Sequence, residues 1–532
     1  MAKSGTIAAA AGIPWKRGPD EGEPQPAACP VRMSFETQHD GCSPETREGF
    51  VTVPPMNQPA QQGPLFRKLS DDQLRRIHNA SLEILERTGV YLHDEEALAL
   101  LKQAGISPSA DGRVRIPSER VDWALKLAPK RVVLYDRYGN PAMPLEGYNV
   151  FYGPGSDCPN VIDLDSGDLR PATLQDGIDG IRLCDGLPNI DFIMSFCLAS
   201  DVDQRLVGLY QMRTMLANSA KPSIFVTPDF IGAVDAIEMA ARVVGGEEAL
   251  RQKPITACYI NVTGPLRHNQ EALQKLVFLS DKGLPFVYVP VVLRGLNGPV
   301  TRAGAIALAN AGEMVGVVLS QLKREGAPII VSGGTNDTID MRTLVDSYAA
   351  PENRLLFMEM AHFYAMPMFG LGGGSDSKLP DEQAAAEAAL TLLVETLSGA
   401  HLIHDVGYLA SGMTASLAQV VICDEIIGWI KRFTQDVEVS DETLALDVIH
   451  ELGAEDQYLA SPHTTAHFRE DWFPRIFDRQ NIDGWRAGGG TSAGVRAARK
   501  ARQILGDHRP EPLPDDLLAA LEHIIQRAAQ RM

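Results

Sequence analysis

The chain has 532 residues, enough for one large α/β domain with appendages or for two to three ordinary domains. It carries 68 acidic against 49 basic residues and a formal net charge of −19. This balance argues against nucleic acid and anionic membranes as partners, because both require clustered cations, and it suits a cationic ligand better.

The seven cysteines are scattered, odd in number and without a C-x-x-C pair. We interpret them as reduced thiols rather than as a disulfide framework or a zinc knuckle. The N-terminus lacks the basic start and apolar core of a secretory signal, and no uninterrupted apolar run reaches membrane-spanning length. These features predict a cytoplasmic protein.

The first part of the chain shows two kinds of sequence. Residues 1–63 are rich in Pro, Gly, Gln and charge without sustained periodicity, which predicts a disordered N-terminal extension. Residues 64–130 predict a small helical cap. Its first helix starts after Ser70, and two more are expected over Glu95–Ala104 and Ser118–Ala128.

From residue 131 to 415, short β-rich runs alternate with amphipathic helical segments. The eight expected strands are Asn149–Tyr152, Phe192–Phe196, Ser223–Val226, Thr256–Val262, Phe286–Val289, Ile329–Ser332, Met368–Leu371 and Leu402–His404. Eight parallel strands with helical crossovers predict an α/β fold and, more specifically, a TIM-type (β/α)8 barrel. A doubly wound sheet is the competing arrangement. Residues 416–532 are expected to form a C-terminal helical region packed on the barrel.

A glycine run, Gly370–Gly374, follows the seventh expected strand. It matches neither the dinucleotide fingerprint nor the phosphate loop with its Lys-Ser/Thr pair. Consecutive glycines do allow a bulky ligand to approach the backbone closely. A tight turn at the barrel mouth explains the run almost as well.

Two histidines flank the eighth expected strand. A spacing of three places His401 and His404 on opposite faces of a strand, so only one can face the barrel interior. His404, followed by Asp405 at the carboxyl end of the strand, is the candidate ligand contact, and His401 is expected to be packed. His463 and His467 share a face if helical, but without a metallopeptidase glutamate a packing role is favoured over metal binding.

Further polar and aromatic residues fall at the expected carboxyl ends of strands. Each polar residue alone fits a helix cap or a turn, so only their shared position is informative. The aromatic residues could bind a quaternary ammonium group by cation–π attraction, and as core residues they are equally ordinary. The polar set is Ser156, Asp157, Thr227, Asp229, Asn261, Thr263, Thr335, Asn336 and Asp337, and the aromatic set is Tyr152, Phe196, Tyr259 and Tyr408.

Several motifs together resemble the trimethylamine methyltransferase family of corrinoid-dependent methyltransferases. The resemblance extends from Leu69 onward and so covers nearly all of the chain after the N-terminal extension. The residues that carry it are Gly372–Asp381, His404–Ser416, Val421–Ile426, His463–Glu470 and Trp472–Arg475. Singly these motifs are unspecific, and together they are specific.

The resemblance implies an α/β barrel whose mouth receives a methylated amine and docks a corrinoid-bearing partner protein. Members that act on trimethylamine have pyrrolysine near the glycine run, where this chain has Gly372–Gly374. A quaternary ammonium needs no such activation, because a neutral tertiary amine leaves when the methyl group is taken. We therefore expect methyl transfer from a small betaine-like quaternary amine to the cob(I)alamin of a separate corrinoid protein.

The expected site follows from this interpretation. His404 and Asn261 are the first candidates for orienting the substrate, with Asp376, Asp405 and Tyr408 next. The glycines Gly372, Gly373 and Gly374 are expected to face the corrin. No general base and no protein-bound metal is expected, and a homo-oligomer is compatible with the sequence.

Two alternatives remain open at this stage. One is a barrel lyase or aldolase that uses Lys378 as a Schiff-base amine. The other is a ligand-sensing or partner-docking barrel without catalytic turnover. The acidic charge and the rim residues do not separate these alternatives, whereas the family motifs favour the methyltransferase.

Overall fold

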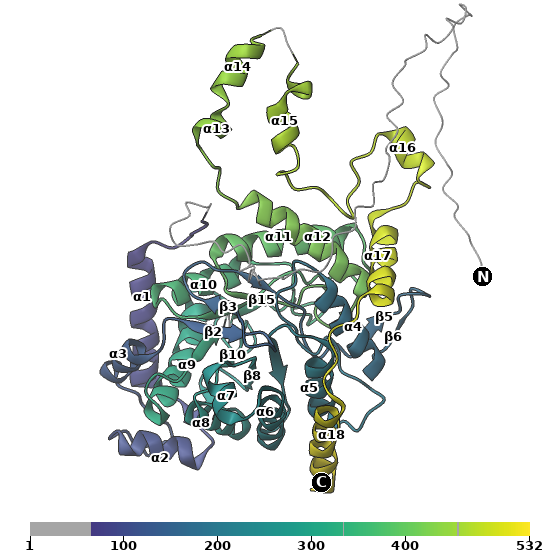
Figure 1. The fold of residues 1–532 in the computed structure, drawn as a ribbon. Helices are drawn as coiled ribbons and strands as arrows, with labels where there is room; N and C mark the ends of the chain where they lie inside the picture. Colours follow the sequence, from purple (N-terminus) through teal and green to yellow (C-terminus); the bar gives the residue numbers. More distant parts are fainter. Residues whose placement is uncertain (1–64, 333–334, 455–456, 532) are drawn as a thin grey trace, which may run out of the picture. The chain divides into compact units, whose positions relative to one another are not determined.

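The computed structural model describes residues 65–332, 335–454 and 457–531 (Figure 1). The expected disordered extension, residues 1–63, lies outside the described residues. So do the side chains of Thr335, Asn336 and Asp337.

Seven strands form one parallel sheet at the centre of the fold. Their apolar runs are buried on both faces, as is usual for a parallel sheet covered by helices. In spatial order they are β4 (Phe151–Tyr152), β15 (Leu402–His404), β14 (Met368–Leu371), β12 (Ile329–Ser332), β10 (Phe286–Pro290), β8 (Thr256–Val262) and β7 (Ser223–Val226).

Residues 191–193 connect the two edge strands of this sheet. The backbone N–H groups of Asp191 and Phe192 donate to the carbonyl of Tyr152 in β4, and Ile193 forms a parallel bridge with Ser223 in β7. The sheet therefore curls into a TIM-type barrel, which confirms the expected fold class. All eight expected strand segments lie in the barrel wall, although the second is reduced to a bridge.

Helices cover the outside of the barrel. In chain order they are α4 (Leu174–Gly186), α5 (Val207–Asn218), α6 (Phe230–Val244), α7 (Glu247–Gln252), α8 (Gln270–Lys282), α9 (Arg302–Lys323), α10 (Glu352–Phe363), α11 (Glu382–Ser398) and α12 (Leu417–Phe433). Local sequence sets their ends: the Asp381 side chain caps α11 at Ala384 N–H, and Gly399 ends it in the left-handed conformation. Because α12 packs on both α11 and α4, it completes the helix layer. The helix layer of the barrel therefore includes α12, which ends at Phe433.

The longest helix, α9, is long and apolar enough to cross a membrane, although the sequence has no uninterrupted apolar run of that length. Among the helices of the described residues, α9 alone has the length and composition of a membrane span. In the structure 83% of its most apolar window is buried, and α1 (Asp71–Glu83), α3 (Ser118–Leu127) and α8 pack against it. The apolar residues of α9 are therefore buried between the barrel and the N-terminal helices.

The remaining N-terminal elements also pack beside α9. They are the π-helical turn η1 (Ile84–Thr88), α2 (Glu95–Gln103) and the strand β1 (Tyr91–Leu92), which pairs with β9 (Arg267–His268). A hairpin of β2 (Val132–Tyr135) and β3 (Pro141–Leu145) then precedes the first barrel strand.

This hairpin closes the N-terminal end of the barrel. Its side chains and the inward-facing residues of the barrel strands form one apolar cluster, which fills the interior in the manner of other α/β barrels. The cluster consists of Val132, Leu134, Met143, Leu145, Phe151, Phe192, Met194, Ile224, Ala257, Val287, Val289, Ile330, Phe369 and Leu402. The carboxyl ends of the strands form the opposite end, which we call the barrel mouth.

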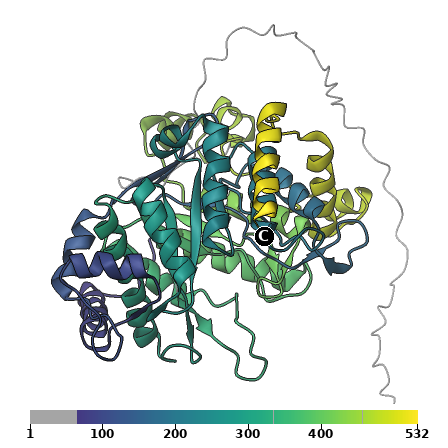
Figure 2. The same cartoon turned by 90° about the horizontal axis from the view of Figure 1, so that it is seen from below.

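The chain beyond α12 is helical, as expected. It forms α13 (Asp441–Leu444), α14 (Leu446–Leu452), η2 (Tyr458–Ala460), α15 (Pro462–His467), α16 (Ile482–Ala487), α17 (Ala493–Asp507) and α18 (Asp515–Gln530). Helices α13 and α14 are separated at Ala445, which has φ +50°. Helix α17 packs on α12, and α18 lies along α5 and α6 (Figure 2).

Candidate functional site at the barrel mouth

Three aromatic rings meet at the upper end of the barrel interior. Tyr259 of β8, Phe369 of β14 and His404 of β15 have ring centroids 4.2 to 6.3 Å apart. Phe369 is buried, whereas Tyr259 and His404 keep part of their surface accessible. The cluster places aromatic faces where a ligand entering the mouth would meet them.

His404 is held in a defined orientation by its own strand pair. Its Nδ1 lies 2.6 Å from the carbonyl oxygen of Gly370, so Nδ1 is the donor and Nε2 faces Asp405 Oδ1 at 3.5 Å. The side chain is 12% exposed, and it is therefore accessible from the mouth without being on the outer surface.

His401 is packed inside the protein, as expected. Its Nδ1 accepts the Met368 N–H at 3.1 Å, and its Nε2 lies 3.0 Å from the Gly147 carbonyl oxygen. Because Nδ1 accepts, the ring is neutral and Nε2 carries the proton that it donates to Gly147. Burial lowers the pKa of His401 to about 3. It is a packed, structural residue.

Two aspartates stand beside the aromatic rings in unusual backbone conformations. Asp405 has φ +71° and is buried, and Asp157 has φ +68° and is accessible to solvent. Non-glycine residues rarely adopt this region, and such conformations cluster at functional sites. Although part of the residue is accessible, the protein around the Asp157 carboxylate removes water from it, and this desolvation raises its pKa. The negative charge of Asp405 adds to the effect, while a hydrogen bond from Gln211 opposes it.

Two phenols lie next to these carboxylates. Tyr408 is buried and donates its hydroxyl to the carbonyl of Phe196 at 2.8 Å. Burial raises the pKa of Tyr348 and of Tyr408 well above the usual value, and the charge of Asp405 contributes to both shifts. Both phenols therefore stay protonated, and the aspartates carry the negative charge of the mouth.

The glycine run is closely packed. Gly372, Gly373 and Gly374 are buried, and a Cβ at Gly374 would lie 2.7 Å from the Tyr348 ring. A Cβ at Gly372 would lie 3.0 Å from Ile403 Cγ2, and Gly373 has φ +84°. Glycine is needed here for close packing inside the protein. The expected contact of these glycines with the corrin stays a prediction.

Asp376 and Lys378 lie on the same loop, and both contact protein groups beside it. The Asp376 carboxylate accepts hydrogen bonds from Tyr348 N–H, Ser347 Oγ and Ser411 Oγ at 2.7 to 2.8 Å. Lys378 is exposed, and its Nζ donates to the carbonyl of Asp376. A Schiff-base lysine is activated by desolvation or by a neighbouring cation, and Lys378 lies in solvent.

Of the other expected rim residues, one lies at the edge of the mouth and the rest make capping or packing contacts. Asn261 ends β8 with an exposed side chain, at the edge of the mouth. Asp229 caps α6, as its alternative interpretation predicted. Tyr152 points outward to Thr396 of α11, and Phe196 packs outward where a Cβ on Gly180 of α4 would collide with its ring.

The structure therefore brings together His404, Asp405, Asp157, Tyr259 and Tyr408 from the expected set. It adds Phe369, Tyr348 and Gln211, which the sequence did not suggest. Phe369 could have been found from strand alternation, because it lies two residues before Leu371, the partner of His404 across β14 and β15. Tyr348 and Gln211 come from a loop and an outer helix, and no local pattern marks them.

His463 and His467 share one face of α15, with ring centroids 4.4 Å apart. His467 Nδ1 lies 2.7 Å from Glu470 and its Nε2 lies 3.3 Å from Glu442. Within the described ranges, no three His, Cys, Asp or Glu side chains are grouped closely enough to hold a metal ion.

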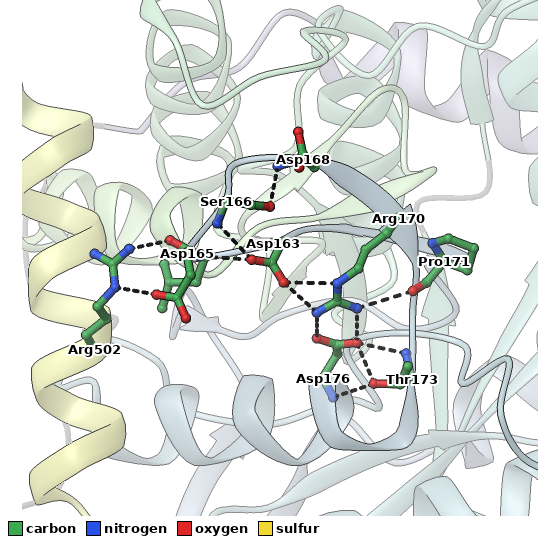
Figure 3. Close-up of polar contacts among 10 residues, drawn as sticks. Asp163, Asp165, Ser166, Asp168, Arg170, Pro171, Thr173, Asp176 and Arg502 are labelled. Atoms are coloured by element: carbon green, nitrogen blue, oxygen red, sulfur yellow. Dashed lines mark hydrogen bonds and ion pairs between the residues drawn. The ribbon is translucent and has the colours of Figure 1, made fainter.

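Arg170 is at the centre of a cluster of ion pairs and hydrogen bonds beside the mouth (Figure 3). Arg170 of β6 (Leu169–Pro171) binds Asp163 at 3.0 Å and Asp176 of α4 at 2.7 and 2.8 Å. Hydrogen bonds from the Ser166 backbone and from Arg170 lower the pKa of Asp163 to about 2. Arg502 of α17 binds Asp165 at 2.9 Å, so the same turn also anchors the C-terminal helices.

Large apolar side chains are exposed on the loops that follow the barrel strands. They belong to the segments after β10, β12, β14 and β15, and all therefore lie on the mouth side of the barrel. They are Leu296, Val300, Met341, Leu344, Leu379 and Met413. Exposed apolar groups of this kind are typical of surfaces that bind another molecule.

Comparison with known proteins adds independent information. The trimethylamine methyltransferase (MTTB) family model matches residues 42–532. The chain is 30% identical to the trimethylamine methyltransferase MttB of Desulfitobacterium hafniense, over 86% of this chain and 93% of that protein. It is 29% identical to a glycine betaine methyltransferase of the same species, over 88% of this chain and 98% of that protein.

Among solved structures, the monomethylamine methyltransferase MtmB of Methanosarcina barkeri is similar, with a TM-score of 0.48 and 12% identity over 83% of this chain and 88% of that chain. The family match spans all of the barrel and all of the C-terminal helices. The chain belongs to the trimethylamine methyltransferase (MTTB) family and is a methyltransferase of that family.

Proposed function

We propose that this methyltransferase removes a methyl group from a small quaternary amine, such as a betaine, and delivers it to the corrinoid of a separate partner protein. The observation that carries this proposal is the composition of the mouth. Aromatic faces from Tyr259, Phe369 and His404 stand beside the carboxylates of Asp405 and Asp157. Aromatic faces and carboxylates together favour a cation that cannot lose its charge.

The leaving group supports a quaternary substrate. When a nucleophile takes a methyl group from a quaternary ammonium, the electrons of the C–N bond stay on nitrogen and a neutral tertiary amine departs. No proton has to be transferred, so the protein need only hold the methyl carbon in line with the incoming nucleophile. A tertiary amine would instead have to expel an amide anion.

Similarity to known proteins does not distinguish a tertiary from a quaternary amine substrate, because proteins named for trimethylamine and for glycine betaine are about equally similar to this chain. The glycine run favours a quaternary amine. The family resemblance associates trimethylamine with pyrrolysine near this position, and here the three glycines are packed tightly, with Gly374 against Tyr348. A quaternary substrate needs no residue there.

Each group at the mouth has a distinct proposed task. The rings of Tyr259 and Phe369 would face the methyl groups of the cation, and Asp405 and Asp157 would balance its charge. His404, fixed by Gly370, would orient the substrate through Nε2. Asn261, exposed at the end of β8, would contact the polar end of a betaine.

The corrinoid of the partner would supply the nucleophile. The exposed apolar side chains around the mouth suit this role, because a corrinoid and the protein that carries it both present apolar surface. Leu296 and Leu344 are 67% and 75% exposed, and we expect them to contact the partner.

An anaerobic assay tests the proposal. Purified protein is mixed with a reduced corrinoid partner protein and a panel of quaternary and tertiary amines, and the cob(I)alamin absorption band is followed. We expect the band to be lost with one quaternary amine and retained with trimethylamine. Turnover with trimethylamine alone would overturn the substrate class, and no turnover with any amine and a verified partner would favour a sensing role.

A surface variant tests the partner contact separately. Leu344→Glu should weaken binding of the corrinoid protein, seen as about a fivefold higher KM for that protein, while the KM for the amine is unchanged. Leu390→Glu, on the outer face of α11, is the matched control, because Leu390 is also exposed but lies away from the mouth.

A further inference from the structure

The region after the last barrel helix exposes an unusual amount of apolar surface. We call residues 434–470 the acidic arm; it contains α13, α14, η2 and α15, and Figure 1 shows these helices extending away from α11 and α12. None of the described residues in these four elements is buried. The exposed large apolar residues of the arm are Val437, Val439, Leu444, Leu446, Ile449, Tyr458, Leu459 and Phe468.

Such an arm is incomplete as it stands. Its helices have between three and seven residues, and isolated helices of that length are not stable in water. Helices in proteins are stabilised mainly by packing an apolar face, and in this arm most of the large apolar residues are exposed, with only Val448 and Leu452 half-buried. A surface outside the arm must cover them.

The charge of the arm limits what that surface can be. Residues 434–470 contain nine acidic residues and one arginine, a net charge of −8. Two arms would repel one another, so a contact between two arms is disfavoured. The complementary surface has to be basic.

The same chain supplies a basic surface. Residues 475–509, which we call the basic segment, contain eight basic and three acidic residues, a net charge of +5 in a chain whose total is −19. Arg479, Arg486 and Arg499 are exposed there, and the structure shows no ion pair between them and any described residue. Ile482 and Val495 add exposed apolar surface to it.

The arm leaves the barrel at the end opposite the mouth. Lys431, near the end of α12, pairs with Asp191 at 3.8 Å, and Asp424 accepts the Asn189 N–H at 2.9 Å. Asn189 and Asp191 lie where the second barrel segment begins, which is the N-terminal end of the barrel. A molecule that docks at the mouth therefore does not account for the arm.

We propose that the acidic arm of one chain binds the basic segment of a second copy, and that the exchange is mutual. The chain then assembles with itself through two identical contacts related by a twofold axis. A specific interface uses about 20 to 30 residues from each partner, and the arm and the basic segment together supply more than that. This assembly is independent of the amine and of the corrinoid.

Sedimentation velocity of the full chain over a range of concentrations and salt tests the proposal. We expect a species of twice the 57.7 kDa chain mass that dissociates as salt screens the charges. The variant Leu446→Ser/Ile449→Ser/Leu459→Ser should weaken self-association at least about tenfold, because it removes apolar contacts at the centre of the arm. Leu390→Ser, an equally exposed leucine on α11, is the control and should leave association unchanged.

Charge reversal makes the test specific for the two surfaces. Arg486→Glu/Arg499→Glu should weaken association, as should Asp447→Arg/Glu451→Arg, and a mixture of the two variants should associate again through restored pairs. Arg76→Glu on α1 is the control for charge alone. A wild-type monomer at all concentrations, or association that survives the triple serine variant, would overturn the proposal, as would failure of the mixture to associate. Retained far-UV circular dichroism shows that each variant is folded.

Discussion

The two ends of the barrel interior have opposite characters. At the N-terminal end, aliphatic and aromatic side chains from the β2–β3 hairpin and the barrel strands fill the space completely with apolar atoms. At the mouth, two carboxylates, a histidine and two phenols stand within one cluster. One barrel thus separates the residues that hold it together from those that can act on a ligand.

Several residues at the mouth also have strained backbone conformations. Asp157, Phe196 and Asp405 all have positive φ, and each follows a barrel strand segment at the mouth. Such conformations cost of order 1 to 3 kcal/mol for a residue such as Phe and less for Asp, and they persist only where the surroundings impose them. The apolar packing at the N-terminal end of the barrel contributes stability that offsets this conformational free energy.

The strongest test of this separation replaces one residue at each end. His404→Ala should lower methyl transfer by about 1000-fold, because it removes the group that orients the substrate, and should cost no more than about 2 kcal/mol of stability for the lost bond to Gly370. Leu402→Ala, two residues earlier on the same strand, should destabilise by about 3 kcal/mol and leave the KM for the amine unchanged. Urea unfolding and the anaerobic assay measure both variants. Equal losses of activity and stability in the two variants would show that the ends are not separate.

A second test uses pH at the structural histidine. Burial lowers the folded-state pKa of His401 to about 3, below the value of about 6.5 in the unfolded chain. The stability contributed by the neutral ring is therefore fully present above pH 6.5 and is lost as pH falls towards 3. At pH 5 the loss is about 2 kcal/mol for this residue.

The variant His401→Gln isolates that contribution from other groups, including His268, which burial shifts in the same direction. It should be less stable than wild type at pH 7, because the bond from the Met368 N–H is disturbed. Its stability should however change less between pH 7 and pH 5, by about 2 kcal/mol. An unchanged pH dependence in urea unfolding would mean that His401 is not buried neutral.

The same contrast explains what could be predicted from the sequence. The barrel strands were predictable because runs such as Phe286–Val289 are buried on both faces and separated by amphipathic helices. His404 and Asp405 were predictable because they end a strand. Tyr348 was not, because it reaches Gly374 and Asp376 from a loop 26 residues earlier in the chain, and its contacts are purely tertiary. The burial of Gly372–Gly374 was not predictable either, because a buried glycine and an exposed one look the same in sequence.

The smallest expected effect concerns the charge of the mouth. Asp405→Asn keeps the size of the side chain and tolerates φ +71°, because Asn also adopts the left-handed region. The loss of one facing charge should raise the KM for a quaternary amine about 20-fold and change kcat less. Asp168→Asn, at an exposed residue on the turn between β5 (Asn160–Ile162) and β6, has the same effect on net charge and should change neither constant.

The pH dependence of KM in Asp405→Asn tests whether the two carboxylates face the same cation. The pKa of Asp157 is raised by desolvation and by the charge of Asp405, so the wild-type KM for a cation should fall as pH rises and Asp157 ionises. Removing the Asp405 charge lowers the pKa of Asp157, and the fall in KM should then occur at lower pH. A profile that does not move would mean that the two carboxylates do not face the same cation, and the mouth would then bind its ligand through the aromatic rings and His404 alone.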